Sequence, residues 1–137
     1  DSYGIKLRIG YGDHENEDCE VHDNLIVNGS LSINNFRQAA SEGNLVLAGD
    51  APRPEGAKAV LIPNKYDPRR AHVALFNWQK AAQVQVNVAG FLEPGERFRL
   101  LDPEDFYGKP LLEGTCDGET IIVPVAGEFG AYVVLKD

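Results

Sequence analysis

A repeat within the first fifty residues decides how this chain can fold. Residues 23–29, DNLIVNG, return twenty positions later as residues 43–49, GNLVLAG. Residues 7–10, LRIG, return twenty-four positions later as residues 31–34, LSIN. Short strands that recur at a fixed interval indicate a chain that winds in coils and stacks like residues on like. Two copies are present, and a solenoid needs about three or more units to bury its core, so this segment is expected to be the end of a longer array.

The net charge of the chain limits which kinds of partner it is expected to bind. The sequence of 137 residues holds 13 basic and 21 acidic side chains, which gives a net charge of −8. Nucleic acids and anionic membranes attract clustered Lys and Arg, and only Arg69 and Arg70 are adjacent here. We therefore expect no nucleic acid and no membrane as a partner. The chain begins at Asp1 and contains no Met, which favours a processed chain or a fragment.

Residues 1–50 are expected to form short strands, because their apolar residues alternate with polar ones. Residues 35–38 and 41–43 are interpreted as turns between them. Alignment of Asn24 with Asn44 places Cys19 over Ala39. Cys19 is therefore expected to be an inward-facing small hydrophobe rather than a disulfide partner of Cys116.

Residues 51–56, APRPEG, contain two prolines and a glycine and are interpreted as a linker. Residues 57–137 predict an antiparallel sandwich, because strand-like runs recur about every ten residues between polar turns. The turns at 93–96 and 117–118 are expected to be hairpins, and the last strand, being apolar on both faces, is expected to be central. The expected strands are 59–62, 72–78, 83–88, 97–101, 120–125 and 131–135.

The strand that ends at Trp78 can face the core in two ways. Either Val73, Leu75 and Asn77 point inward, or the complementary set of Ala74, Phe76 and Trp78 does. The second phase is favoured, which makes Trp78 a core residue.

Residues 23–27 and 42–46 resemble the closing coils of a right-handed parallel β-helix, the pectate-lyase-like solenoid of secreted polysaccharide-active proteins. In that family, stacked Asn side chains form a hydrogen-bonded ladder at a turn, and the resemblance assigns this structural role to Asn24 and Asn44. The family implies a secreted or periplasmic protein. It places working carboxylates on the outer face of central coils, whereas Ser30 and Ser32 lie above Lys6 and Arg8 here, which argues against catalysis.

Residues 63–68, PNKYDP, residues 72–78, HVALFNW, and the closing hydrophobic strand resemble the small β-sandwich that follows catalytic or solenoid domains in carbohydrate-active proteins. The resemblance implies a possible glycan surface and carries over no catalytic residue. Aromatic side chains stack on the apolar faces of sugars. The candidate carbohydrate-binding residues are Tyr66, Phe106, Tyr107 and Trp78.

No cofactor is expected. The acidic run of Asp13, Glu15, Glu17 and Asp18 offers oxygen ligands for a weak Ca²⁺ site, although it lacks the glycine and the spacing of an EF-hand loop. A solvated loop is the simpler interpretation. Residues 102–105, DPED, are interpreted as a polar connection, and no nucleophile elbow or phosphate loop appears.

These observations predict an all-β protein, with β-helix coils over residues 1–50 and a sandwich over residues 57–137. The expected role is a non-catalytic C-terminal module that caps the solenoid and binds carbohydrate or a protein partner. One alternative is a fragment of a polysaccharide lyase or glycoside hydrolase whose catalytic coils lie upstream. Another is a structural subunit that self-associates through its open solenoid end.

Overall fold

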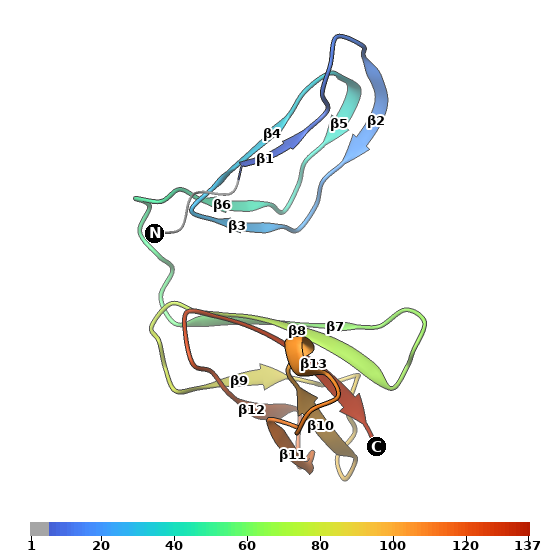
Figure 1. The fold of residues 1–137 in the computed structure, drawn as a ribbon, viewed down its shortest axis with the longest axis vertical. Helices are drawn as coiled ribbons and strands as arrows, with labels where there is room; N and C mark the ends of the chain where they lie inside the picture. Colours follow the sequence, from blue (N-terminus) through green and yellow to red (C-terminus); the bar gives the residue numbers. More distant parts are fainter. Residues whose placement is uncertain (1–5) are drawn as a thin grey trace. The chain divides into compact units, whose positions relative to one another are not determined.

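Strands make up nearly all of the regular structure in this chain. The computed structural model describes residues 6–137, and the helical exception is a single 3-10 turn, η1 (Pro103–Asp105). The protein is therefore all-β, as expected from its alternating apolar residues. In the described part of the chain, no helix is long and apolar enough to span a membrane. The chain divides into two units, Asp1–Arg53 and Pro54–Asp137, and the division falls within the Pro-rich segment 51–56 (Figure 1).

The N-terminal unit is built from three pairs of parallel strands. The chain passes through three strands in succession and then through three more that lie beside them, so that β4 pairs with β1, β5 with β2 and β6 with β3 (Figure 1). The strands are β1 (Lys6–Ile9), β2 (Asn16–Glu20), β3 (Leu25–Val27), β4 (Ser30–Ile33), β5 (Phe36–Ala40) and β6 (Leu45–Leu47). Cys19 lies opposite Ala39 and Leu25 lies opposite Leu45, as the alignment of the repeat predicts.

The two repeat intervals in the sequence have a structural cause. Six residues, 10–15, connect β1 to β2, whereas two residues, 34–35, connect β4 to β5. The first connection is thus four residues longer, which changes the register from twenty-four positions at Lys6 and Ser30 to twenty at Asn16 and Phe36. Two residues of the acidic run, Asp13 and Glu15, lie in this longer loop, and Glu17 and Asp18 lie on β2.

The interpretation of residues 35–38 as a turn is wrong, because Phe36–Ala40 form strand β5. The turn is made at Asn35, whose φ of 57° lies in the left-handed region that Asn tolerates. The apolar pattern of β5 is weak, and the strand exists through its pairing with β2. Tertiary pairing here overrides local sequence preference.

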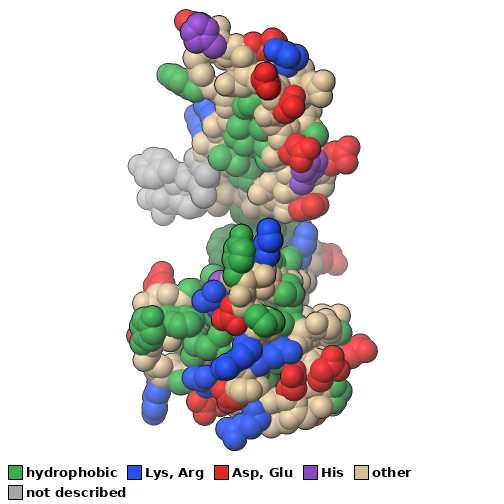
Figure 2. Space-filling view, turned by 90° about the vertical axis from the view of Figure 1, so that its right-hand side faces the viewer, with side chains coloured by type: hydrophobic (Ala, Val, Ile, Leu, Met, Phe, Trp, Pro, Cys, Tyr) green, Lys and Arg blue, Asp and Glu red, His purple; other side chains and the backbone are tan. Residues whose placement is uncertain are grey.

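The apolar interior of the N-terminal unit is incompletely covered. Ile26 and Leu47 are buried, but Leu7 is 37% exposed, Leu45 38% and Val46 39%. Figure 2 shows hydrophobic side chains at the surface of this unit, bordered by acidic ones. Two turns of chain leave such residues open because every strand has one partner.

The C-terminal unit consists of two antiparallel sheets over one core. A five-stranded sheet has the order β11-β10-β13-β8-β7, and a two-stranded sheet pairs β12 with β9. The strands are β7 (Ala57–Pro63), β8 (Arg70–Asn77), β9 (Gln83–Asn87), β10 (Arg97–Leu101), β11 (Leu112–Thr115), β12 (Thr120–Pro124) and β13 (Phe129–Lys136). This arrangement is consistent with a sandwich. The last strand is central in its sheet, as predicted.

The core of this unit comes from alternating residues on both sheets. Val84, Val86 and Val88 are buried, as predicted, whereas the residues between them are exposed. On β8, Val73 and Leu75 point inward together with Asn77, and all three are at most 2% exposed. The phase favoured from the sequence is therefore wrong, and Trp78 lies outside the core as a half-buried residue. The sequence favours the wrong phase because a buried Asn is uncommon unless its hydrogen bonds are met.

Two predicted hairpins are also wrong. The turn at residues 93–96 joins β9 to β10, and the turn at 117–118 joins β11 to β12, and in both cases the two strands belong to different sheets. Turn chemistry is local and does not determine which strands pair. Strand β11 is absent from the expected strands, because its sequence, LEGT, has little β-propensity.

Candidate functional site

Asn24 and Asn44 lie together at the turns that precede β3 and β6. The Oδ1 atom of Asn44 accepts hydrogen bonds from the backbone N of Asn24 at 3.0 Å and from its Nδ2 atom at 2.9 Å. The Nδ2 atom of Asn44 donates to the Val21 carbonyl at 2.6 Å and to the Ser41 hydroxyl at 3.0 Å. The Nδ2 atom of Asn24 also donates to the His22 carbonyl at 2.8 Å. One side chain thus joins two successive turns of the chain.

A third asparagine, Asn35, holds the longer loop between β1 and β2. The Asn35 carbonyl accepts hydrogen bonds from Asn16, from its backbone N at 2.7 Å and from its Nδ2 at 3.1 Å. The Asn35 side chain in turn donates to the carbonyl of Gly12, whose φ is 98°. Asn35 therefore holds the loop at Gly12, in its middle, and at Asn16, where β2 begins. This role was not predicted from the sequence.

Three aromatic rings meet on the outer face of the five-stranded sheet. Phe76 and Trp78 have ring centroids 5.8 Å apart and planes inclined by 19°, and Phe129 stands edge-on to Phe76 at 5.6 Å and 84°. Phe129 lies opposite Phe76 in the register of β13 and β8 and is 50% exposed. We call Phe76, Trp78 and Phe129 the ring surface.

The ring surface continues into an apolar margin on the edge strand β7. Val60 and Ile62 project from the same outer face, because they lie opposite Ala74 and His72 in the register of β7 and β8. They are 37% and 54% exposed. The sequence points to Trp78 as a candidate but not to Phe76 or Phe129. Phe76 could have been found from the alternative phase of β8, because in that phase Phe76 and Trp78 both lie on the solvent-facing side of the strand.

Buried Asn77 fixes the strand end from which Trp78 projects. Its Nδ2 atom donates to the carbonyls of Ala81 at 2.7 Å and Gly127 at 3.1 Å, and its Oδ1 atom accepts from the Ala81 backbone N at 3.0 Å. Its own backbone N donates to the Glu128 carbonyl at 2.7 Å. Asn77 is fully buried, and these bonds meet its polar groups. Asn77 thus joins two loops, at Ala81 and at Gly127, to the end of β8 beside the ring surface.

The predicted loop aromatics occupy other places. Tyr66 is 86% exposed between β7 and β8, with the Lys65 ammonium 5.5 Å from its ring centroid. It lies near Arg70, at the opposite end of β8 from Trp78. Phe106 and Tyr107 follow η1 and contact each other edge-to-face at 5.2 Å. The structure therefore does not gather Tyr66 and Trp78 into one site, and Tyr107, 97% exposed, is open to solvent.

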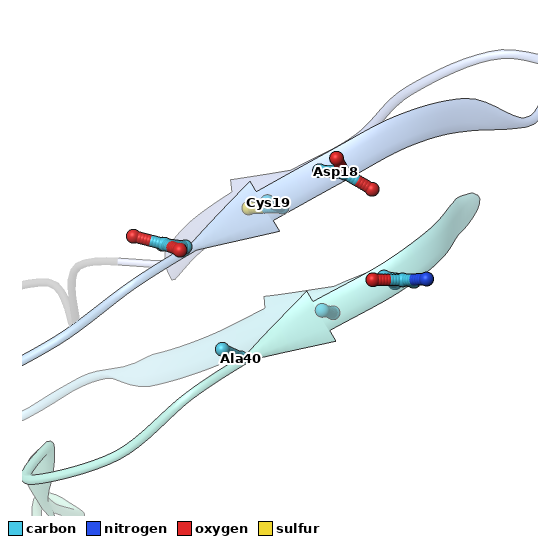
Figure 3. A pocket seen from close by; sticks show the side chains of 6 residues that line it. Asp18, Cys19 and Ala40 are labelled. Carbon is cyan, nitrogen blue, oxygen red and sulfur yellow. The ribbon is translucent and has the colours of Figure 1, made fainter.

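The two cysteines are free and lie in different units. Cys116 is buried, and its thiol lies 2.9 Å from the Gly118 carbonyl. Cys19 is half-buried and lines a cavity of about 260 Å³ between β2 and β5 (Figure 3). The prediction that these residues do not form a disulfide is confirmed.

The acidic run gives no metal centre in this structure. Across residues 6–137, no three His, Cys, Asp or Glu side chains come together in a way that could hold a metal ion. Glu15 lies 3.9 Å from Arg37, and both are well exposed. Glu17 and Asp18 are neighbours on β2, so their side chains leave opposite faces of the strand. The weak Ca²⁺ site at Asp13, Glu15, Glu17 and Asp18 stays a prediction.

A cleft in the C-terminal unit surrounds Tyr132 and Asp102. Two cavities, of about 410 and 250 Å³, have these two residues in common. The Tyr132 hydroxyl donates to the Pro124 carbonyl at 3.0 Å. Burial, and secondly the negative charge of Asp102, raise the pKa of Tyr132 above its usual value. The sequence predicts a polar connection at Asp102 and a central apolar strand over residues 131–135, which contains Tyr132.

The described residues thus present two kinds of surface that could hold a ligand, a partly exposed group of aromatic rings and a cleft with a carboxylate and a phenol. No protein-family model matches this chain, and comparison with curated proteins and with solved structures likewise gives no match.

Proposed function

We propose that this chain is a non-catalytic module of a polysaccharide-associated, secreted or periplasmic protein. Its N-terminal unit forms the last two coils of a right-handed parallel β-helix. Its C-terminal unit is a β-sandwich that closes the solenoid and binds a glycan on the ring surface. The single observation that carries the binding function is the contact among Phe76, Trp78 and Phe129 on the outer face of a sheet.

The physical argument for a glycan rests on the shape and chemistry of the ring surface. Phe76 and Trp78 stack on each other at 19° and are half-buried, and the 50% exposed Phe129 stands edge-on to Phe76, so the three rings form one apolar cluster at the surface of β8 and β13. Large exposed apolar patches on soluble proteins mark interaction sites. Sugars have flat apolar faces that match aromatic rings, and weak stacking on an open surface suits a long polymer. The loop aromatics Tyr66, Phe106 and Tyr107 are further contacts for the same polymer under this proposal.

The β-helix assignment is supported by the strand-for-strand parallel pairing and by the side-chain bonds between Asn24 and Asn44. A sandwich that follows the last coil has a physical role, because the open end of such a stack is a set of unpaired strand edges that invites aggregation. The opposite edge, along β1, β2 and β3, has no strand partner among the described residues. Upstream coils, or a second copy of this chain, are the partners proposed for it.

Catalysis is the less favoured alternative. On the outer face of β1 and β4, Lys6 lies opposite Ser30 and Arg8 lies opposite Ser32. Metal-assisted proton abstraction needs carboxylates to hold the cation, and this face presents hydroxyls. We propose that this chain alone has no lyase or hydrolase activity, which assays for unsaturated products and for reducing ends on acidic and neutral polysaccharides can test.

A binding screen with variants tests the glycan proposal. The protein is passed over immobilised neutral and acidic polysaccharides, with Trp78→Ala as the test variant. Tyr11→Ala is the matched control, because Tyr11 is 93% exposed and lies in the other unit. Loss of the Trp78 ring, at about 1–2 kcal/mol in total, should weaken binding about 5–30-fold. Binding that is unchanged in Trp78→Ala and lost in Tyr11→Ala would move the glycan site to the N-terminal unit.

A further inference from the structure

We propose that the cleft around Tyr132 and Asp102 binds a small organic cation, an ammonium group carried on an apolar body. This site is separate from the ring surface. Tyr132 points inward from β13, because it lies opposite the buried Val73, whereas Phe129 lies opposite Phe76 on the outer face. The two ligands would thus approach opposite faces of the sheet, and neither proposal depends on the other.

The larger cavity supplies the apolar half of the site. Its volume of about 410 Å³ lies within the range of about 300–1,000 Å³ that small-molecule pockets occupy. Five of its seven lining residues are apolar, and Asp102 and Tyr132 are the polar ones. The apolar lining consists of Ala82, Leu111, Pro124, Val125 and Ala126. A ligand that fills this cavity must therefore be apolar over most of its surface.

The charged residues that line the two cavities are negative. Asp102 lines both cavities and Glu104 lines the smaller one, and no Lys, Arg or His side chain lines either of them. The Asp102 carboxylate accepts one hydrogen bond, from the Glu104 backbone N at 2.9 Å, and no ion pair reaches it from any described residue. A carboxylate beside an apolar cavity favours a cationic ligand, because the cation gains a partner and the carboxylate is neutralised.

The ring of Tyr132 provides the third element of the site. Its hydroxyl is engaged with the Pro124 carbonyl, which fixes the direction of the ring. Gly130, two residues earlier on the same face, leaves room for it, since a Cβ there would come within 2.6 Å of the ring. A cation beside a fixed aromatic face is attracted by the ring quadrupole. Carboxylate, ring and apolar cavity together match an arylalkyl or alkyl ammonium.

Matched small probes test this proposal directly. Phenethylamine, phenethyl alcohol and 3-phenylpropionate share a ring and a short chain and differ in charge. Each is titrated into the full chain while amide NMR signals are followed. We expect phenethylamine to shift the signals of Ala82, Ala126 and Ala131 with a Kd on the order of 1 mM, and the neutral and anionic probes to bind about tenfold more weakly or worse.

Two charge-matched variants locate the site. Asp102→Asn retains an acceptor for the Glu104 backbone N, so the turn stays capped while the charge is lost. Glu119→Gln removes one charge from an exposed side chain at the start of β12, the other end of that strand from Pro124. Asp102→Asn should weaken phenethylamine binding about tenfold, and Glu119→Gln should leave it unchanged.

Three outcomes would overturn the proposal. Equal binding of the amine and the alcohol would show that the ligand's charge does not contribute to binding. An equal loss of phenethylamine affinity in both variants would show that the net charge of the protein, and not Asp102, causes the effect. A lysine-containing peptide that bound more tightly than phenethylamine would assign the cleft to a protein partner instead. Glycan binding is measured in a separate experiment, with Trp78→Ala. A negative result at the cleft therefore does not affect the proposal for the ring surface.

Discussion

The side-chain oxygen of Asn44 accepts two hydrogen bonds from Asn24, one from the backbone N at 3.0 Å and one from the Nδ2 atom at 2.9 Å. These residues are twenty positions apart and hold equivalent places in two successive turns of the chain. The second turn is thus bonded to the first by a side chain as well as by the strands on either side. Backbone hydrogen bonds also cross this turn, from the Asp23 N to the Glu42 carbonyl at 3.1 Å and from the Leu45 N to the Asn24 carbonyl at 2.8 Å, and the asparagine pair adds side-chain bonds to them.

Replacement of Asn44 by Ala should destabilise the N-terminal unit by about 1–3 kcal/mol. The change leaves the Asn24 backbone N and the Val21 carbonyl without their partner. Urea unfolding measured with a probe in this unit checks the value. Gln38→Ala is the control, because the Gln38 side chain is exposed on β5 of the same unit. Equal losses in the two variants would show that the pairing of Asn24 with Asn44 adds nothing.

Replacement of the buried Asn77 by Ala should cost more, about 2–4 kcal/mol in the C-terminal unit. Three hydrogen bonds disappear, and the Ala81 and Gly127 groups that remain are part-buried. Asn64→Ala is the control, since its half-buried side chain accepts bonds only from the backbone N of Tyr66 and of Asp67. A loss under about 1 kcal/mol for Asn77→Ala would mean that water replaces its bonds.

Stability should fall in acid partly through Glu96. A hydrogen bond from the Glu93 backbone N, and then one from the Lys136 ammonium, hold the pKa of Glu96 below its usual 4.5. A depressed folded pKa contributes stability that is present above the unfolded pKa and is lost as the pH falls through the folded pKa. The difference in unfolding free energy between the wild type and Glu96→Gln should therefore be constant well above pH 4.5 and shrink below it.

Chemical or thermal unfolding at a series of pH values measures that difference. Glu119→Gln is the control for the loss of one negative charge from an exposed side chain. A difference that did not change as the pH fell below the usual pKa would contradict the role given to Glu96.

The pKa of Tyr132 should fall part of the way to its usual 10.0 in Asp102→Asn. Burial is the larger cause of the raised pKa and is unchanged by the substitution, so only the part due to the charge of Asp102 is removed. Ultraviolet titration of the phenolate measures it, with Tyr132→Phe identifying the signal among five tyrosines. An unaltered titration would mean that the two side chains do not interact.

Much of the fold could be predicted from periodicity alone. The repeat of residues 23–29 in 43–49 gives the register of β3 and β6, and the alternation at Val84, Val86 and Val88 identifies the buried face of β9. Both are local patterns with a fixed period. The pairing of Asn24 with Asn44 follows from the same register.

The parts that failed depend on contacts distant in sequence. Strand β5 is held by β2, and the turns at 93–96 and 117–118 join strands of different sheets, which no local residue reveals. Which face of β8 is buried depends on the hydrogen bonds of Asn77. Its side chain donates to the carbonyls of Ala81 and Gly127, and Gly127 lies fifty residues away in the sequence. The ring surface was missed because Phe129 meets Phe76 only through the pairing of β13 with β8.

The central claim, that the ring surface binds glycan, can be measured through Trp78 itself. It is the single tryptophan of the chain, so the intrinsic tryptophan fluorescence of the protein reports on this site alone. Soluble oligosaccharides from the polysaccharides that bind in the screen are titrated in, and acrylamide quenching is compared with and without them. We predict a saturable change in tryptophan emission and protection from the quencher. Saturable glycan binding with unchanged emission and unchanged quenching would contradict the claim.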